Sequence, residues 1–413
     1  MIRNLNKNLN DSLYVYKNID ELEHFKYIWC KKNFFRRYLQ CIYILLKRTL
    51  VYFDFKRNNF TNNEIEVLLY INSENTFNSL KFLKSEKALF FKQVSQLKKT
   101  TDEKYVVNNV RVPLWITIIS IFNFPFFALK YWGKALKYPE LYFENFGKEY
   151  SNERVLRKFK LLKKVVFAND HNVHNRLFKI ACEKVNIKTV YLQHASVTSM
   201  FPKLDFDQNF LFGDVDLIKY KKIGQIIGEV FLVGSPKFDE LYQYRRNIVT
   251  EKKYTFGLAL NLIDETEKIK SLIDIVLTNT SYNIIVRMHP GDKRKLNYST
   301  ERITIQNAKD SSLLSFFSNI DFMLAGESSI HLESLYVYIP SFYINLTINE
   351  NKDYYEFLKF NLIKELNLRG ISDEHFLKLS VEPISTENLK LFIHSINEIY
   401  DGNVEEYIIS NLC

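Results

Sequence analysis

The stretch KVVFANDHNVHNRLFKIACEKVNIKTVYLQHA, residues 164–195, carries the pattern that decides the fold. Its apolar runs at 164–168 and 189–192 have the length and the Val and aromatic content of buried strands. Between them, residues 174–186 repeat apolar positions with the period of an amphipathic helix. A strand, a crossover helix and a second strand form a βαβ unit, so this stretch predicts a parallel sheet.

The same alternation continues on both sides of this unit. Strands are predicted near 65–71, 88–92, 209–213, 229–235, 254–261, 282–289, 302–307, 321–326 and 340–345, and helices near 79–86, 216–224, 264–279, 312–320 and 330–338. Two sets of strands surround YQYRRNIVTEKKY, 242–254, which has few aliphatic residues and is interpreted as a linker. The fold class is therefore α/β, with two Rossmann-like domains that face a central cleft.

The predicted domains cover residues 1–241 and 242–413. A chain of 413 residues exceeds what one hydrophobic core normally supports, which also favours two domains. The first 150 residues are expected to form a basic and aromatic helical region, and the chain from 349 onward a helical tail. The amino-terminal domain is assigned to the acceptor and the carboxyl-terminal domain to a nucleotide donor.

The net charge of +10 is spread along the chain, without an arginine-rich tract or zinc-finger spacing, so no nucleic-acid partner is expected. Residues 31–57 alternate paired bases with aromatic and aliphatic residues. This mixture suits peripheral contact with an anionic inner-membrane surface, and equally an ordinary packed helix with solvated lysines. The segment 113–132 contains Asn123 and Pro125 and is expected to be buried or to dip into an interface rather than to span a bilayer.

The cysteines and the amino terminus indicate the cellular compartment of the protein. Cys30, Cys41, Cys182 and Cys413 lack metal-ligand spacing and are expected to be reduced thiols. The amino terminus is too polar for a signal peptide, so a cytoplasmic protein is predicted. The acidic residues form no cluster typical of a magnesium site, so neither a metal nor a resident cofactor is expected.

Polar residues follow two predicted strands of the first domain. Asn169, Asp170 and His171 follow the strand near 164, and Gln193 and His194 follow the strand near 189. Carboxylate and imidazole groups at such strand ends are candidates for a general base, and we assign that role to Asp170 or His194. Asn169, His171 and Gln193 are assigned to acceptor binding. The competing interpretation is that Asp170 only caps the following helix.

In the second domain, a buried strand ends in Arg287, Met288 and His289, and Pro290 closes it because proline lacks an amide donor. An imidazole at this position can donate to a phosphate oxygen. The alternative is a histidine that only caps the turn.

A second strand end in this domain carries Glu327, Ser328 and Ser329 at the start of a helix. Hydroxyl groups there are suited to an anion, although serine is also a common helix cap. Glu333 lies one turn further along and is expected to reach a ribose hydroxyl, unless it is an ordinary surface glutamate. Together with Arg287, His289 and Pro290, these residues form the predicted donor site.

The order of VYLQHA, VGSPKFD, RMHPGD and GESSIHLESLYVYIPSFY resembles the GT-B glycosyltransferases of bacterial capsule and surface-polysaccharide synthesis. Within that group it is similar to sialyl- and polysialyltransferases and to CDP-glycerol glycerophosphotransferases. The resemblance covers about residues 160–345 and implies that His289, Pro290, Ser328 and Ser329 hold the donor phosphate or cytidine. Gln193 and His194 match the family's Gln-His-Gly motif, except that Ala195 replaces its glycine.

The resemblance implies a metal-independent, inverting glycosyltransferase. The donor would be a sugar linked to CMP or CDP, with a nonulosonic acid as one candidate, and the acceptor a surface polysaccharide or lipid-linked glycan. Three alternatives remain: a CDP-polyol phosphotransferase of teichoic-acid type, a non-hydrolysing sugar-nucleotide epimerase, and a non-catalytic scaffold docked on a membrane.

Overall fold

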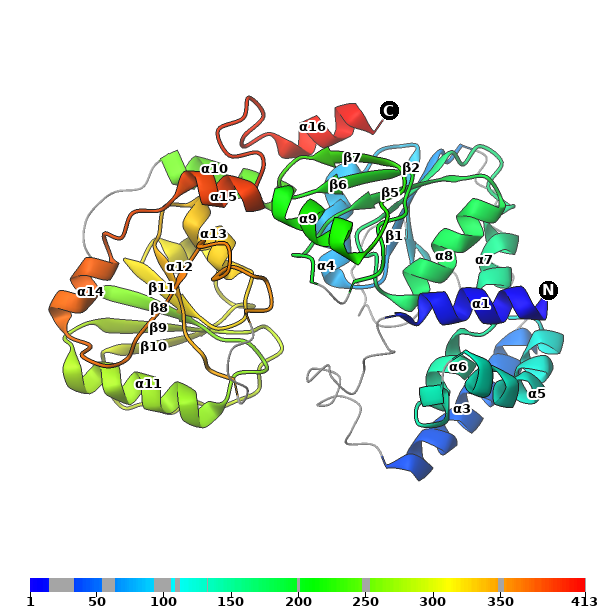
Figure 1. Ribbon diagram of the computed structural model, residues 1–413, viewed down its shortest axis with the longest axis horizontal. Helices are drawn as coiled ribbons and strands as arrows, with labels where there is room; N and C mark the ends of the chain where they lie inside the picture. Colours follow the sequence, from blue (N-terminus) through cyan, green and yellow to red (C-terminus); the bar gives the residue numbers. More distant parts are fainter. Residues whose placement is uncertain are drawn as a thin grey trace. The chain divides into compact units, whose positions relative to one another are not determined.

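The computed structural model describes residues 1–14, 33–53, 64–92, 105–107, 112–131, 133–198, 201–246, 253–347 and 353–412. These residues form two compact units (Figure 1). Unit 1 comprises Met1–His194, Ser199–Phe210 and Lys219–Phe231, and unit 2 comprises Ala195–Thr198, Leu211–Ile218 and Leu232–Cys413.

Unit 1 is organised around a seven-stranded sheet in the order β3-β2-β1-β4-β5-β6-β7. The pairs from β3 through β6 are parallel, as the βαβ pattern predicts. Its strands are β1 (Val67–Ile71), β2 (Ala88–Lys92), β3 (Tyr105–Val107), β4 (Lys164–Phe167), β5 (Lys188–Leu192), β6 (Gln208–Leu211) and β7 (Glu229–Leu232). The helices are α1 (Ile2–Ser12), α3 (Phe34–Phe53), α4 (Glu74–Leu80), α5 (Leu114–Lys130), α6 (Pro139–Asn145), α7 (Lys148–Leu156) and α8 (Val173–Lys184), with short 3₁₀ turns η2 (Lys81–Leu83) and η3 (Gly133–Leu136). Helix α9 (Asp214–Ile223) belongs to unit 1 from Lys219 onward.

Helix α8, the crossover between β4 and β5, packs on the sheet through Phe178. Its ring lies 4.6 Å from that of Tyr70 on β1 and 5.0 Å from that of Phe91 on β2. The Tyr70 ring in turn lies 5.4 Å from that of Phe167 on β4. Aromatic burial across three neighbouring strands therefore fixes α8, and with it the loop between β4 and α8.

Unit 2 contains a six-stranded sheet in the order β10-β9-β8-β11-β12-β13, and its pairs are parallel. The strands are β8 (Thr255–Ala259), β9 (Asn283–Met288), β10 (Ile303–Asn307), β11 (Phe322–Ala325), β12 (Ser341–Tyr343) and β13 (Lys364–Glu365). The helices are α10 (Asp239–Arg246), α11 (Thr266–Asn279), α12 (Leu313–Phe317), α13 (Ile330–Tyr336), α14 (Asp373–Leu379), α15 (Thr386–Phe392) and α16 (Val404–Asn411), with the turn η4 (Pro236–Phe238).

Side chains of strand β8 pack in two hydrophobic cores, one on each face of the sheet. Phe256 and Leu258 belong to the core that includes α11, whereas Ala259 belongs to the core that includes α12 and α13. A Cβ atom at Gly257 would lie 2.5 Å from the Phe316 ring, so only glycine allows α12 to approach this strand. Side chains on both faces are therefore covered, as expected of a parallel sheet.

The carboxyl-terminal tail packs within unit 2. The amide of His394 donates to the Phe212 carbonyl and the Tyr400 hydroxyl to the Leu232 carbonyl. Gly234, at φ +78°, passes so close to Ser395 that an added Cβ would lie 2.3 Å from its Oγ. The segments 211–218 and 232–238 thus belong to the same compact unit as the end of the chain.

The α/β prediction is confirmed, and the strands predicted near 164 and 189 are β4 and β5. Two details were wrong. The helix predicted at 79–86 begins earlier, at Glu74, because Ser73 and Thr76 form a reciprocal capping box. The first residues of the predicted linker 242–254 are helical, because they belong to α10. Arg245 of this helix is held in place, since it pairs with Asp401 at 2.7 Å and stacks on Tyr336. Residues 247–252 lie outside the described residues.

The first 150 residues are not only helical. They contribute β1, β2 and β3 to the sheet, besides α1, α3, α4, α5, α6 and part of α7. Cys41 and Cys182 are buried free thiols, whereas Cys30 and Cys413 lie outside the described residues. Within the described part of the chain, every helix is too short or too polar to cross a bilayer.

Candidate functional site

The residues assigned to acceptor chemistry meet at one edge of the unit 1 sheet. Phe167 of β4 pairs with Tyr191 of β5 and with Tyr70 of β1, so the three strands end level with one another. Side chains that follow parallel strands emerge at the same edge. The structure therefore brings Asn169, Asp170 and His171 next to the strand end that leads to Gln193 and His194.

Asp170 is fully buried at this edge of the sheet. Its Oδ2 accepts a 2.5 Å hydrogen bond from the Tyr220 hydroxyl, and its Oδ1 lies 3.1 Å from Nδ1 of His171. Burial, followed by the nearby Asp170 carboxylate, raises the pKa of Tyr220 well above its usual value, which keeps the phenol protonated as a donor. Asp170 therefore orients its neighbours and has no exposed atom to meet a substrate.

The helix-capping alternative for Asp170 is wrong, because α8 is capped by Asn172. The Asn172 side chain accepts from the amide of His174 at 2.9 Å. Asn169 supports the same turn, since its Oδ1 accepts from the amides of His171 and Asn172. The loop is thus held by amide side chains, and the Asp170 carboxylate is left for His171 and Tyr220.

His171 is the group of this cluster that reaches solvent, with 30% of its side chain exposed. With the proton on Nδ1 directed to Asp170, its Nε2 accepts from Nδ2 of Asn169 at 3.3 Å. The ring also lies 4.4 Å from that of Phe201. This arrangement holds one tautomer and one orientation, which is what a general base requires.

Gln193 and His194 follow the end of β5 at Leu192. Gln193 is buried, and its backbone amide donates to the Phe210 carbonyl, which extends the pairing with β6. His194 is half-buried two residues beyond the strand. Gln193 thus lies within the extended pairing, whereas His194 lies at the edge assigned to chemistry.

The residues assigned to the donor meet at the corresponding edge of the unit 2 sheet. Ala259 of β8 pairs with Arg287 of β9 and with Ala325 of β11, so these neighbouring strands end level. Nδ1 of His289 accepts from the amide of Gly291 at 3.0 Å. In the neutral ring the proton is therefore on Nε2, which makes this nitrogen a donor.

Arg294 ties together the loops that follow β8 and β9. Its guanidinium donates to the carbonyl of Asn261 at 2.6 Å and to the carbonyl of Asp264, and pairs with Asp292. Burial raises the pKa of the Asp292 carboxyl, but hydrogen bonds from Arg294 outweigh this and lower it overall. The side chain of Asn261 reaches the third loop, because its Nδ2 donates to the Glu327 carbonyl at 2.8 Å.

Asp264 lies beneath these loops. It is buried, and its Oδ2 accepts from the amide of Asn261 at 2.6 Å, while its Oδ1 is buried without a hydrogen-bond partner. Burial raises the pKa of this carboxyl from 3.8 to about 6. A buried carboxylate with an unsatisfied oxygen is costly, and such groups are concentrated at functional sites.

Several predicted donor ligands have structural partners. Arg287 is buried and donates to Oγ of Ser311 at 2.7 Å and to its carbonyl at 3.1 Å. The Glu327 carboxylate accepts from the Tyr343 hydroxyl and from the amide of Tyr354. In these contacts Arg287 and Glu327 position the loops around the edge.

Ser328 and Ser329 are half-buried at the start of α13. Oγ of Ser328 accepts a long, 3.4 Å bond from the amide of Ile330, while Ser329 makes no side-chain cap. Glu333 is not an ordinary surface residue, because its Oε1 pairs with Nζ of Lys237 at 2.7 Å and its Oε2 is buried without a hydrogen-bond partner. Lys237 lies in the GSPKFD motif, which the pair joins to α13.

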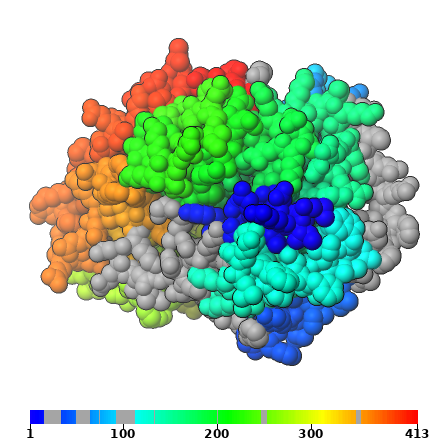
Figure 2. Space-filling view, turned by 45° about the vertical axis from the view of Figure 1, so that its right-hand side comes forward, coloured from blue at the N-terminus to red at the C-terminus, as the bar shows by residue number. Residues whose placement is uncertain are grey.

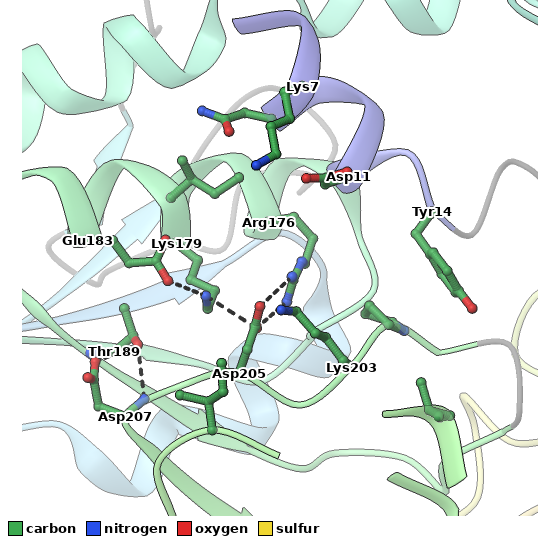
Figure 3. Close-up of a pocket in the computed structure, with 15 residues that line it drawn as sticks. Lys7, Asp11, Tyr14, Arg176, Lys179, Glu183, Thr189, Lys203, Asp205 and Asp207 are labelled. Carbon is green, nitrogen blue, oxygen red and sulfur yellow. Dashed lines mark hydrogen bonds and ion pairs between the residues drawn. The ribbon is translucent and has the colours of Figure 1, made fainter. Parts of the chain in front are cut away.

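A pocket of about 550 Å³ lies elsewhere in unit 1, between α1, α8 and the segment 202–207 (Figure 3). Thr189 and Asp207 line it, so it is beside the amino ends of β5 and β6, away from the strand-end residues. Arg176 forms a two-point pair with Asp205, and Lys179 contacts the same carboxylate at 3.2 Å. The charges satisfy one another, which is typical of a structural ion network.

Sequence reasoning missed Tyr220, Asp264 and Arg294. Tyr220 is 50 positions from Asp170 and lies within helix α9 with no motif around it, so nothing local marks it. Asp264 and Arg294 follow strand ends, which was the signal used for the other site residues, but neither directly adjoins its strand.

No family model matches the chain, and no curated protein matches it. Solved structures are similar at low identity. The UDP-GlcNAc 2-epimerase of Methanocaldococcus jannaschii is 12% identical, covering 84% of this chain and 99% of that one, with a TM-score of 0.48. The glycosyltransferase SnogD of Streptomyces nogalater is 10% identical, covering 84% and 100%, with 0.49. A variant of the wall teichoic acid polymerase TagF soaked with CDPG is 13% identical, covering 92% and 96%, with 0.48.

Proposed function

We propose that the protein is a metal-independent, inverting glycosyltransferase of the cytoplasmic face of the membrane. It would move a sugar from a CMP- or CDP-linked donor to a hydroxyl of a surface polysaccharide or lipid-linked glycan. The observation that carries the proposal is the Asp170–His171 pair at the carboxyl edge of the unit 1 sheet. A histidine held by a buried carboxylate is a recurrent device for removing a proton from a hydroxyl.

His171, rather than Asp170, takes the part of general base in this proposal, because Asp170 is buried and His171 is partly exposed. The acceptor hydroxyl displaces the long Asn169 contact from Nε2 of His171. This nitrogen then removes the acceptor proton while the acceptor oxygen attacks the anomeric carbon of the donor. The bond from that carbon to the phosphate oxygen breaks, and its electron pair leaves with the nucleotide. Asp170 stabilises the resulting imidazolium through Nδ1, and one direct displacement inverts the anomeric configuration.

On the donor side, His289 and Ser328 are proposed to hold the phosphate. Nε2 of His289 and the Ser328 hydroxyl offer neutral donors to the charge that develops on the leaving group. His194 is kept as an acceptor-positioning residue, because it follows β5, the strand that pairs with β4.

The first experiment identifies the nucleotide. Thermal unfolding of the full chain is measured with CMP, CDP, UDP and GDP, since a ligand selective for the folded state raises the unfolding temperature. We expect stabilisation by a cytidine nucleotide, and loss of this stabilisation in His289→Ala. Absence of stabilisation by any nucleotide would contradict donor binding.

The second experiment tests the base with CMP- and CDP-sugars and isolated glycan acceptors. His171→Gln is expected to lower kcat about 10²- to 10⁴-fold with little change in donor affinity, because only the proton transfer is lost. Asp170→Asn is expected to lower kcat as well, since the amide cannot accept from both Tyr220 and His171. His375→Gln, a histidine on α14, is the matched control. Full turnover in His171→Gln with a loss in His194→Gln would move the base to His194.

A further inference from the structure

The neighbouring helices α3 and α5 of unit 1 each expose a set of large apolar side chains. They pack against each other, and the two views of the molecule show them side by side (Figures 1 and 2). We call the outward side of this pair the α3–α5 face. Exposed apolar patches of this kind mark interaction sites in soluble proteins.

The inward side of α3 is fixed by polar contacts, which determines what its other side exposes. Arg37 forms a buried 2.8 Å pair with Glu140 of α6, Cys41 is buried, and Arg48 donates to the carbonyls of Glu144 and Phe146. These positions recur with the helical period. The opposite stripe, which is exposed, consists of Phe35, Leu39, Ile42, Tyr43 and Leu46.

Helix α5 is fixed in the same way. Asn123, which interrupts its apolar sequence, donates to the Tyr142 hydroxyl at 2.8 Å and shares paired amide bonds with Asn6. The buried stripe includes Ile116, Ser120, Phe124 and Phe127. The exposed side consists of Trp115, Ile118, Ile121, Phe122, Phe126 and Leu129. Phe122, Phe126 and Leu129 are 74, 71 and 83% exposed, which is unusual for residues of their size.

The charge around this face has one sign. The described segments 33–53, 112–131 and 133–138 contain no aspartate or glutamate. Their exposed polar residues include Arg36, Lys47, Lys130 and Lys137. Aromatic and aliphatic side chains rimmed by cations match the boundary between acyl chains and anionic headgroups.

We infer that the α3–α5 face docks on an anionic lipid bilayer, with the apolar side chains in the headgroup and acyl boundary. A second copy of the chain fits this face poorly, because a symmetric contact would bring like cations together. The inference rests on exposure and charge alone and does not depend on the proposed transferase activity. Docking through this face would place unit 1, with the proposed base His171, beside a lipid-linked acceptor.

The test is flotation of the full chain with vesicles. Vesicles containing phosphatidylglycerol are expected to bind the protein and vesicles of phosphatidylcholine alone to bind it weakly, with binding that falls as salt is raised. The double variant Phe122→Ser and Phe126→Ser is expected to bind roughly tenfold or more weakly, since two aromatic side chains no longer enter the membrane. The control is Val381→Ser with Ile399→Ser, two exposed apolar residues of unit 2.

The charge is tested separately with Arg36→Glu, Lys47→Glu and Lys130→Glu, against Lys221→Glu with Lys222→Glu on α9. The first set is expected to abolish the preference for anionic vesicles, and the control set to retain it. Unfolding temperatures of all variants show whether they fold. Equal binding by folded wild type and Phe variant would overturn the inference. So would a concentration-dependent dimer, measured by light scattering, that is lost in the Phe variant while vesicles do not bind.

Nucleotide-induced stabilisation separates this inference from the proposed function. A variant that fails to float but keeps its response to nucleotide has lost only the docking surface. A wild type that floats but shows no response to any nucleotide supports docking and removes the transferase proposal.

Discussion

Replacing Asp264 by asparagine should change how the stability of the protein depends on pH. Burial raises the pKa of this carboxyl from 3.8 to about 6 in the folded chain. Between these values the folded state holds a proton that the unfolded state releases. The contribution of Asp264 to folding therefore becomes less favourable as pH rises from about 4 through about 6, after which it stays constant.

The size of this effect follows from the pKa difference. A rise from 3.8 to about 6 corresponds to about 3 kcal/mol of free energy of unfolding, at about 1.4 kcal/mol per pKa unit. The Asn261 amide and Arg294 act in the opposite direction and are already included in that value. Asparagine keeps an oxygen for the Asn261 amide but carries no charge, so it removes the pH dependence while preserving the turn.

The assay is urea unfolding of the wild type and of Asp264→Asn, followed by circular dichroism from pH 4 to pH 8. Stability of the variant relative to the wild type should increase by about 2.5 kcal/mol across this range, with most of the change below pH 6.5, because part of the full effect lies below pH 4. Asp274→Asn, on the exposed side of α11, is the matched control. Parallel curves for wild type and Asp264→Asn would refute the assignment of a strained carboxylate to this site.

Three further outcomes are expected. Burial lowers the pKa of His331 to about 4, so its contribution to stability should fall as pH drops from about 6.5 to about 4, and His331→Gln should remove about 3 kcal/mol of that dependence in urea unfolding. Glu140→Ala should lower the free energy of unfolding by about 3–5 kcal/mol, because Arg37 is left buried without its carboxylate. Gly228→Ala should lower the unfolding temperature, since φ is +81° and a Cβ would lie 2.0 Å from the Phe206 carbonyl oxygen.

The sheets were predictable because their signal is local. Each buried strand is a short apolar run, and each crossover helix lies between two such runs, as in residues 164–195. The sequence could also place Asp170 and His289 at strand ends, because the position directly after a strand is fixed by the strand itself. It could not order the strands, since the sequence of runs is compatible with several sheet topologies.

The roles within the site depended on partners that sequence periodicity does not reveal. The sequence assigned the base to Asp170 or His194 and only acceptor binding to His171. The hydrogen bond from Tyr220 and the difference in burial are what favour His171 over Asp170. Glu333 was expected to face a ribose, but its Oε1 is paired with Lys237, almost a hundred positions away. Such contacts are set by packing between helices and loops, which no short motif encodes.

The return of the carboxyl-terminal tail onto residues 212, 232 and 234 has a consequence for synthesis of the protein. All strands of the first sheet have left the ribosome once residue 232 has emerged, so that sheet can assemble while translation continues. The second unit lacks these packing partners until residues 394–400 have emerged. A ribosome that stalls late would therefore yield one folded unit and one incomplete one, a species open to proteolysis in its carboxyl-terminal half.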